Sequence, residues 1–447
     1  MSDINEIKNN AVAEKRDFWK RKNWYYYKYI EDCLLPFLIP PGRKILEIGC
    51  GTGDLLAKLR PVKGVGIDIS EKLVEAARKK YRNKNLEFKV AEVEELKDKF
   101  DFVVLSDLIG HLDDVEKVFR SIHKVSHSRS RIVITQYSQL WEPVLKLGSK
   151  LGLKMPSLPQ NWLSTADIEN LLYISGFETI KKSGKLLFPK YVPLLSSFLN
   201  RFLVNFFPFN KLSLINFIIA RPLSIFTTTS PISVADKYRV SIIVPARNEA
   251  GMIKKIVDEL PNLGSATEII FIEGHSIDNT LREIKRVISV YKGPKIIKFA
   301  AQDGIGKGDA VRKGFEMATG DILMIYDADM TVPPYELVKF YNIIVERKGE
   351  FINGSRLVYP MEKQSMRILN FVGNKFFSLM FSWLLGQRIK DTLCGTKVLW
   401  KSDYEEIKRN RSFFGDFDPF GDFDLLFGAA KLNIKIVDLP VHYRERI

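Results

Sequence analysis

The chain has 447 residues, of which 46% are hydrophobic, 12% aromatic and 27% charged. Domains average roughly 150 residues, so this length predicts two or three of them, and the apolar content is enough to fill their cores. The formal net charge of +15 favours an anionic partner, such as a phosphorylated substrate, nucleic acid or an acidic membrane surface.

Cysteine usage and the N-terminus point to the cytoplasm. Cys33, Cys50 and Cys394 are scattered and form no CxxC pair, which favours a reducing compartment and argues against a structural zinc site. The N-terminus MSDINEIKNN is polar and lacks the apolar core of a signal peptide. No window reaches about 18 uninterrupted apolar residues, so we expect no membrane span.

The first half of the chain alternates short β-rich runs with helical patterns, such as EKLVEAARKKY at 71–81. Repeated β-α-β order predicts an α/β fold with a parallel, doubly wound sheet. The expected strands are 44–50, 64–69, 86–91, 100–106 and 131–137, and 177–187 and 214–221 would complete the same sheet.

A glycine-rich turn, LEIGCGTGDLL, follows the first expected strand. Its glycines would allow a tight turn and the close approach of a ligand to backbone N–H groups. Asp68 ends the second strand, where a carboxylate can bind the two hydroxyls of a ribose. Glu92 ends the third strand, and Ser106 and Asp107 end the fourth.

This pattern resembles the class I S-adenosylmethionine-dependent methyltransferases over roughly residues 20–225. The resemblance implies a Rossmann-like fold, S-adenosyl-L-methionine as cofactor and methyl transfer. It implies that Asp68 binds the ribose hydroxyls and that Glu92 lies near the adenine, where the family more often has Asp. It also implies that Glu47, Gly49, Gly51 and Gly53 line the methionine and ribose part, and that Ser106 and Asp107 border the transfer site. The alternatives are another nucleotide cofactor or a site without activity.

His111 follows the fourth strand and is a candidate general base for those methyl acceptors that need one. The alternative interpretation is a residue at a helix start, packed near the cofactor. The methyl acceptor itself is left open.

The second half restarts the β-α-β order near Val240, after a Thr-, Ser- and Pro-rich linker at 227–238. We therefore expect a methyltransferase-like domain at 1–226 and a second doubly wound α/β domain at 239–447. The strands of the second domain are expected at 240–246, 268–274, 295–301 and 321–329.

Asp327 and Asp329 end the last of these apolar strands. Carboxylates two residues apart on a strand point the same way. Their oxygens suit Mg²⁺ or Mn²⁺ bridging a diphosphate, because these cations prefer hard oxygen ligands. The alternative is a pair of carboxylates that cap the following turn.

The motifs VPARNE (244–249), EGHSIDNT (273–280) and GKGDAVRKGFEMATGD (306–321) accompany this DAD motif. Together they resemble the family 2 glycosyltransferases of the GT-A fold, from about Val240 onward. The match is to the branch that passes a sugar from a nucleotide to a polyisoprenyl phosphate. EGHSIDNT departs from the family's DDGSxDxT, which leaves the nucleotide preference open. The resemblance implies a nucleotide-sugar site formed by Pro245, Arg247, Asn248, Glu249, Glu273, Asp278, Lys307 and Asp327.

The same resemblance assigns the acceptor region. Arg356 in NGSRLVY would contact a phosphate, and KDTLCGTKVLW matches the DxxCGxK stretch of the lipid-acceptor branch. Transfer to a hydroxyl would need a carboxylate base, in the region of Asp422 or Asp424, unless that acidic run only caps a helix. A lipid phosphate would instead need cations, for which the candidates are Arg356, Lys397 and Arg444.

Two apolar segments suggest contact with a membrane surface. An amphipathic insertion at 188–212 contains FLNRFLVNFFPFN, and residues 181–235 include no Asp or Glu. A second apolar segment spans 368–390. Apolar faces with only basic charges are typical of helices that lie in an anionic interface. The alternative is packing against the fold or the other domain.

These observations predict a bifunctional enzyme, peripherally attached to the cytoplasmic membrane face. It would transfer a sugar from a nucleotide sugar to a polyisoprenyl phosphate with inversion, and methylate a glycan or lipid-linked acceptor. One alternative makes the methyltransferase-like half a binding or scaffold module. A basic nucleic-acid methyltransferase is disfavoured, because no RNA-binding module is evident. The oligomeric state is left open.

Overall fold

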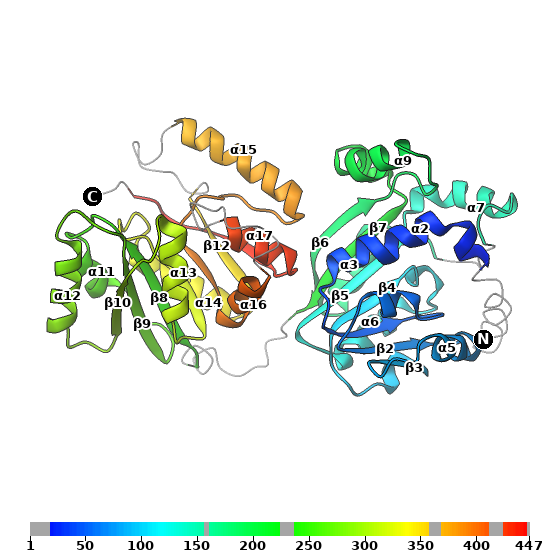
Figure 1. The fold of residues 1–447 in the computed structure, drawn as a ribbon, viewed down its shortest axis with the longest axis horizontal. Coiled ribbons are helices and arrows are strands. Elements are labelled where there is room, and N and C mark those ends of the chain that lie inside the picture. The colour runs from blue at the N-terminus through cyan, green and yellow to red at the C-terminus, as the bar shows by residue number, and fades with distance from the viewer. Residues whose placement is uncertain (1–17, 156–160, 224–236, 357–367, 411–422, 445–447) are drawn as a thin grey trace. The chain divides into compact units, whose positions relative to one another are not determined.

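The computed structural model describes residues 18–155, 161–223, 237–356, 368–410 and 423–444. The chain divides into two compact units, 1–225 and 226–447, each built on its own sheet (Figure 1). Residues 227–236 of the expected linker lie outside the described residues.

The N-terminal unit contains a seven-stranded sheet in the order β3-β2-β1-β4-β5-β7-β6. Strands β1 to β5 are parallel, as the sequence predicts, but β7 runs antiparallel to both β5 and β6. The expectation of a parallel sheet is therefore confirmed for β1 to β5 and wrong at this edge, where β7 lies between β5 and β6 and pairs antiparallel with both. The strands are β1 Lys44–Ile48, β2 Lys63–Asp68, β3 Leu86–Val90, β4 Phe100–Ser106, β5 Ser126–Tyr137, β6 Phe177–Lys185 and β7 Ile215–Pro222.

Helices cover both faces of this sheet, and alternating strand residues feed two separate cores. Ile45 packs into one core with Leu56, whereas Leu46 packs into the other with Phe119. The helices are α2 Trp24–Lys28, α3 Leu35–Leu38, α4 Asp54–Lys58, α5 Glu71–Lys80, α6 Val115–Ile122, α7 Glu142–Lys150, α8 Thr165–Ile174 and α9 Leu195–Ser197.

The C-terminal unit has a seven-stranded sheet in the order β10-β9-β8-β11-β13-β12-β14. Strands β10, β9, β8 and β11 are parallel, while β13 is antiparallel to its neighbours β11 and β12. The strands are β8 Arg239–Ala246, β9 Ala266–Glu273, β10 Ile296–Ala301, β11 Ile322–Ile325, β12 Phe351–Ser355, β13 Lys397–Trp400 and β14 Ile436–Pro440. The helices are α11 Ile253–Glu259, α12 Thr280–Val290, α13 Lys307–Met317, α14 Leu337–Val345, α15 Ile368–Leu385, α16 Lys401–Arg409 and α17 Phe423–Lys431.

Strand β11 ends at Ile325, so the expectation of a strand through 329 is too long. The chain turns because the buried Tyr326 hydroxyl donates to the Val332 carbonyl at 2.7 Å, and Asp329 accepts from Thr331. Asp327 and Asp329 therefore lie on a loop beyond the strand. Within the described residues, no helix is long and apolar enough to cross a membrane.

Candidate active sites

The turn after β1 needs its glycines for both conformation and space. Gly49, Gly51 and Gly53 have φ angles of 73°, 54° and 77°, a region that other residues rarely adopt. A Cβ at Gly49 would lie 2.8 Å from the Leu108 side chain, and one at Gly53 would lie 2.6 Å from the Phe88 ring. Larger residues would therefore disrupt this turn.

Asp68 at the end of β2 is held against the same turn. Its Oδ2 accepts from the Gly51 amide at 2.9 Å, and its Oδ1 accepts from the Ser70 amide at 2.9 Å. Glu47 is buried beneath the turn and accepts from the Leu56 amide at 3.1 Å. The structure thus brings together Glu47, the glycine turn and Asp68.

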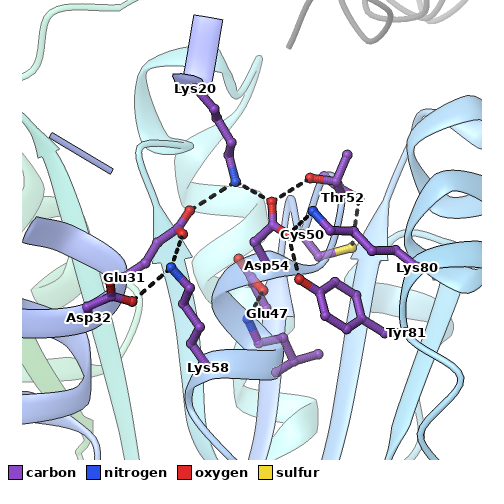
Figure 2. A network of polar contacts seen from close by, with 12 residues as sticks. Lys20, Glu31, Asp32, Glu47, Cys50, Thr52, Asp54, Lys58, Lys80 and Tyr81 are labelled. Atoms are coloured by element: carbon purple, nitrogen blue, oxygen red, sulfur yellow. Dashed lines mark hydrogen bonds and ion pairs between the residues drawn. The ribbon is translucent and has the colours of Figure 1, made fainter. Parts of the chain in front are cut away.

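Asp54, the first residue of α4, is the centre of a polar network (Figure 2). Its carboxylate oxygens lie 2.7 Å from Lys20 Nζ and 2.5 Å from Lys80 Nζ, and they accept from the Tyr81 hydroxyl at 2.6 Å. Burial opposes the ionisation of Asp54, but the two lysines and the tyrosine hold its pKa well below its usual value. Asp54 is therefore a buried anion with fixed partners.

Lys20 also connects Asp54 to a second carboxylate, as Figure 2 shows. Its Nζ donates to Glu31 Oε1 at 2.9 Å, and Glu31 in turn pairs with Lys58 at 3.0 Å. The network joins the N-terminal helical segment to α4, directly after the glycine turn. Sequence reasoning missed it because its partners are spread from residue 20 to residue 81. The only local signal was an acidic residue directly after the glycine turn.

The residues expected at the ends of β3 and β4 lie in two different settings. Glu92 is exposed, and its backbone amide donates to Glu95 Oε1 at 3.1 Å at the start of a short 3₁₀ turn. Ser106 Oγ lies 3.1 Å from Thr135 Oγ1 on the neighbouring strand β5. His111 is exposed on a 3₁₀ turn formed by Ile109–His111.

Asp107 belongs to a cluster of aromatic and charged groups beyond the end of β4. Its Oδ2 accepts from the Tyr26 hydroxyl at 2.5 Å, and the Tyr26 ring stacks on Tyr137 with centroids 5.5 Å apart. Burial and then the Asp107 charge raise the pKa of Tyr26 well above its usual value. Lys154 Nζ lies 4.9 Å from the Tyr137 ring centre. The sequence did not single out Tyr26, Tyr137 or Lys154 as part of this site.

In the C-terminal unit, hydrogen bonds join the loops that follow β8 and β9. The Asn248 amide donates to Ser276 Oγ at 3.0 Å, and Asn248 Oδ1 accepts from the Ile277 amide at 2.9 Å. The Glu249 amide donates to Thr280 Oγ1 at 2.9 Å. The VPARNE and EGHSIDNT motifs therefore form one structural unit.

Glu273, the residue that replaces the family's first Asp, is buried at the end of β9. Its Oε1 accepts from the Ser276 amide at 2.6 Å, so the longer carboxylate supports its own loop. Asp278 is exposed and accepts from the Thr280 amide at 2.9 Å. Pro245 is half-buried, and Arg247 is exposed.

Lys307 and Asp327 form an ion pair between the start of α13 and the loop after β11. The Lys307 Nζ lies 2.5 Å from Asp327 Oδ1, and a Cβ at Gly395 would collide with both side chains. Burial opposes the ionisation of Asp327, but Lys307, followed by Lys397 and Arg356, lowers its pKa below the usual value. Three segments therefore converge on one anionic group.

Asp329 is the second carboxylate expected to bind a metal. Its Oδ1 accepts from the Thr331 hydroxyl at 2.9 Å and from the Thr331 amide at 3.2 Å. The described residues contain no group of three or more His, Cys, Asp or Glu that could hold a metal by itself. The oxygens of Asp327 and Asp329 fit Mg²⁺ or Mn²⁺ if a substrate diphosphate supplies further ligands.

Arg356 at the end of β12 is held by Asp391 in a two-point contact. Nε lies 2.8 Å from Oδ2 and Nη2 lies 3.0 Å from Oδ1, and the guanidinium carbon is 5.1 Å from the Tyr443 ring centre. Burial works against the charge of Arg356, but Asp391 raises its pKa above the usual value. Asn374 of α15 donates to Asp391 Oδ1 at 2.7 Å. The arginine is therefore fixed in orientation.

The remaining acceptor candidates are spread over several positions. Lys397 is fully buried, and its Nζ donates to the Cys394 carbonyl at 2.5 Å. Arg444 is exposed, and its backbone amide donates to the Thr331 carbonyl at 2.9 Å. Asp424 lies in the first turn of α17 and lines a hollow of about 60 Å³ with residues of α13 and α16, whereas Asp422 lies outside the described residues.

Both units thus place charged and polar loops around the ends of parallel strands, an arrangement typical of enzymes that bind nucleotide ligands. Residues 39–174 match the sequence profile of a family described as "Methyltransferase domain". Residues 241–407 match the profile described as "Glycosyl transferase family 2". The chain joins a methyltransferase domain of Rossmann-like fold to a family 2 glycosyltransferase domain of GT-A fold.

Individual relatives match one half of the chain each. A UDP-N-acetylglucosamine–dolichyl-phosphate N-acetylglucosaminyltransferase of Methanococcus voltae is 27% identical over 229 residues, which is 47% of this chain and 88% of the relative. A ubiquinone/menaquinone biosynthesis C-methyltransferase of Vibrio parahaemolyticus is 32% identical over 25% of this chain and 46% of its own length. A solved methyltransferase structure from Aquifex aeolicus is 16% identical, covering 48% of this chain and 98% of its own, with a TM-score of 0.34.

Proposed function

We propose that the C-terminal unit transfers a sugar from a nucleotide sugar to a polyisoprenyl phosphate with inversion, and that the N-terminal unit uses S-adenosyl-L-methionine to methylate a glycan or lipid-linked acceptor. The observation that carries this proposal is the convergence of Lys307, Asp327 and Gly395. The loop that provides Gly395 also provides Asp391, which orients Arg356. Donor and acceptor groups therefore share one loop, and the dolichyl-phosphate relative supports the acceptor class.

Sugar transfer to a lipid phosphate needs cations that position the phosphate and stabilise the leaving diphosphate more than it needs a general base. A lipid phosphate is anionic at neutral pH, so its oxygen attacks the anomeric carbon directly while the bond to the nucleoside diphosphate breaks. Arg356 would position the acceptor phosphate, and Asp391 fixes the plane of its guanidinium. A divalent cation held by Asp327 and Asp329 would neutralise the negative charge that develops on the leaving diphosphate.

In the methyltransferase domain, Asp68 and the glycine turn would bind the cofactor's ribose and methionine parts. Asp68 already accepts from the Gly51 amide, so little reorganisation is needed on binding. Asp107 and Tyr26 would border the acceptor at the transfer site.

Incubation with radiolabelled nucleotide sugars, a polyisoprenyl phosphate and Mn²⁺ tests the glycosyltransferase proposal. We expect lipid-soluble label that depends on the metal and is lost in Asp327→Asn. If no nucleotide sugar yields lipid-soluble label with the unsubstituted protein, the proposed acceptor class is wrong.

A second candidate for the N-terminal unit is cofactor binding without methyl transfer. It is favoured by Tyr26, which is buried and covers Asp107 at the expected transfer site. Calorimetry with S-adenosyl-L-methionine should show binding that Asp68→Ala abolishes. Asp98→Ala, which removes an exposed carboxylate paired with Lys63, should leave binding unchanged. Binding without methylation of any lipid-linked glycan would favour the second candidate.

Peripheral attachment to the cytoplasmic membrane face is part of the proposal, and α15 supports it. Asn374, Ser378 and Ser382, spaced four residues apart, bond to the unit through Asp391 and the Ile389 carbonyl. Leu379 and Trp383 are 68% and 50% exposed. These polar groups and the buried Phe381 ring anchor the helix, which still exposes Leu379 and Trp383.

A further inference from the structure

The segment at 191–212 of the methyltransferase domain is folded with its polar side inward. Ser196, Asn200 and Val204, spaced four residues apart, are 0%, 4% and 1% exposed. Asn200 Oδ1 accepts from the Leu187 and Phe188 amides, both at 2.8 Å, and its Nδ2 donates to the Phe188 carbonyl at 2.7 Å. Asn200 also donates to the Tyr25 hydroxyl at 3.3 Å, so hydrogen bonds from this one residue hold the segment to its domain.

Aromatic side chains of the same segment point outward. Phe198, Phe202 and Phe207 are 53%, 56% and 71% exposed, and Leu194 is 89% exposed. Phe198 stacks on Phe202 with centroids 5.7 Å apart, so the exposed rings form a continuous surface. A helix that fills a core has the reverse arrangement, because burying apolar rather than polar groups stabilises the fold.

Helix α7 extends this apolar surface. Trp141 Nε1, just before α7, donates to the Leu212 carbonyl at 2.8 Å and so connects the two segments. Val144, Leu147 and Leu151 are 55%, 57% and 65% exposed. We call the exposed side chains of 191–212 and 140–153 the apolar face of the methyltransferase domain.

The charges around the apolar face favour an anionic occupant. Residues 181–235 contain no Asp or Glu, and Lys190, Arg201 and Lys211 are exposed within them. Glu142 is the one acidic residue at 140–153, and its charge is paired with Lys146. Lys211 Nζ lies 5.1 Å from the Phe207 ring centre, so cationic and apolar groups alternate at close range. Two copies of this face would bring like charges together, whereas an anionic bilayer complements both the charge and the apolar rings.

The apolar face also adjoins the candidate transfer site. Lys154, directly after α7, lies over Tyr137, which stacks on Tyr26. Tyr26 bonds to Asp107 at the end of β4. An acceptor embedded in the bilayer would therefore reach this edge of the sheet without leaving the lipid surface.

We propose that the apolar face binds an anionic lipid bilayer independently of α15. Binding there would bring the candidate methyl-transfer site close to acceptors that are embedded in the lipid. The proposal rests on the proposed membrane attachment but on neither transfer reaction. Segment 191–212 and α15 have one feature in common: polar residues spaced four apart bond to their own unit, while several large apolar side chains are exposed. In α15, the Phe381 ring is buried against Phe423 and Phe427.

The test uses the full chain with α15 disabled by Leu379→Ser/Trp383→Ser. In that background, Phe198→Ser/Phe202→Ser/Phe207→Ser removes three rings from the apolar face. The matched control, Val62→Ser/Tyr173→Ser/Ile174→Ser, removes three exposed apolar side chains of the same domain outside it. Co-sedimentation is measured with vesicles of phosphatidylglycerol and phosphatidylcholine, and with phosphatidylcholine alone, while circular dichroism verifies folding.

We expect the α15-disabled protein to bind anionic vesicles, and the phenylalanine substitutions to weaken that binding by about tenfold or more. The control should stay within about twofold, and added salt should weaken binding because the cations contribute. Equal binding by the phenylalanine variant and the control would overturn the proposal. So would a wild-type dimer that the phenylalanine substitutions dissociate, since the occupant would then be a second copy. Vesicle binding without labelled lipid product would reject the proposed glycosyl transfer and leave this surface standing.

Discussion

The ammonium of Lys307 lies 2.5 Å from a carboxylate oxygen of Asp327, and the α-carbon of Gly395 lies directly against this pair. The three residues come from segments that are well separated in the sequence, yet they form one contact beyond the end of β11. The pair explains why Asp327 is ionised although it lies in a partly buried position.

Replacing Lys307 by Met should lower the kcat/KM of sugar transfer by about 100-fold, because a preorganised cation is lost where negative charge develops. The pKa of Asp327 should also rise, since Lys307 is the main group that lowers it. The acid limb of the pH–rate profile should therefore move to higher pH. Lys313→Met on the same helix, which removes a surface pair with Asp303, is the control and should change neither quantity. An unmoved acid limb in Lys307→Met would contradict the assignment.

Replacing Gly395 by Ala should abolish sugar transfer while leaving cofactor binding by the methyltransferase domain intact. The added Cβ would collide with Asp327 and with the Lys307 ammonium, so the loop would have to shift. Gly373→Ala is the matched control, because a Cβ there meets nothing within 4 Å. Both variants are assayed for lipid-soluble label and for S-adenosyl-L-methionine binding. A fully active Gly395→Ala enzyme would show that this close approach is dispensable.

Replacing Lys20 by Met should destabilise the methyltransferase domain by about 1–3 kcal/mol, because a buried carboxylate loses one of its cations. Lys146→Met removes a surface pair with Glu142 and should cost less than about 0.5 kcal/mol. Denaturant unfolding followed by circular dichroism measures both changes. Equal losses in the two variants would show that the buried network adds nothing beyond a surface pair.

The pH dependence of Asp54 gives a further check on the same network. Its folded pKa is depressed from an ordinary value of 3.8, so its stabilising effect is present above that value and is lost as pH falls through the folded pKa. The difference in unfolding free energy between wild type and Asp54→Asn should therefore be constant near neutral pH and shrink below about pH 4. A difference that grows on acidification would contradict the ion-pair assignment.

The three cysteines should differ sharply in reactivity. Burial, followed by the Asp391 charge, raises the pKa of the Cys394 thiol to about 11, and Cys50 is also buried. Because the thiolate is the reactive form, iodoacetamide at about pH 8 should modify Cys33 alone in the folded protein. Mass spectrometry should find one adduct in the native protein, none in Cys33→Ser and three after unfolding. Rapid native modification of Cys394 would mean that its loop opens readily.

Local patterns in the sequence predicted the strands of the N-terminal sheet and the first four strands of the C-terminal sheet, but not β12, β13 and β14. Short β-rich runs identify β1 to β5, and the glycines at 49, 51 and 53 identify the tight turn after β1, because both signals depend on neighbours in the chain. The length of β11 was overestimated, since the Tyr326 contact that turns the chain is set by tertiary packing. The lysines around Asp54 could not be found, because no spacing rule relates residue 20 to residue 54.

The segment 198–210 shows a further limit of sequence patterns. The apolar residues of this segment recur about every four positions, which predicts an apolar side. The period does not say whether that side faces the domain or the surroundings. That choice depends on whether the opposite side can satisfy buried backbone groups, and Asn200 does so for Leu187 and Phe188. The direction of the apolar side is therefore decided by a polar residue and by its distant partners.

Greater hydrophobicity usually means greater affinity for lipid, but at Asn200 we expect the opposite. Replacing it by Leu would make the segment more hydrophobic on any scale. The Leu187 and Phe188 amides and the Phe188 carbonyl would, however, lose their hydrogen bonds to the Asn200 side chain. A detached segment would no longer hold its phenylalanines in fixed positions on the surface of the domain. If the proposed apolar face binds lipid, its affinity would depend on keeping this position polar. A search for membrane-binding residues by hydrophobicity alone would pass over Asn200.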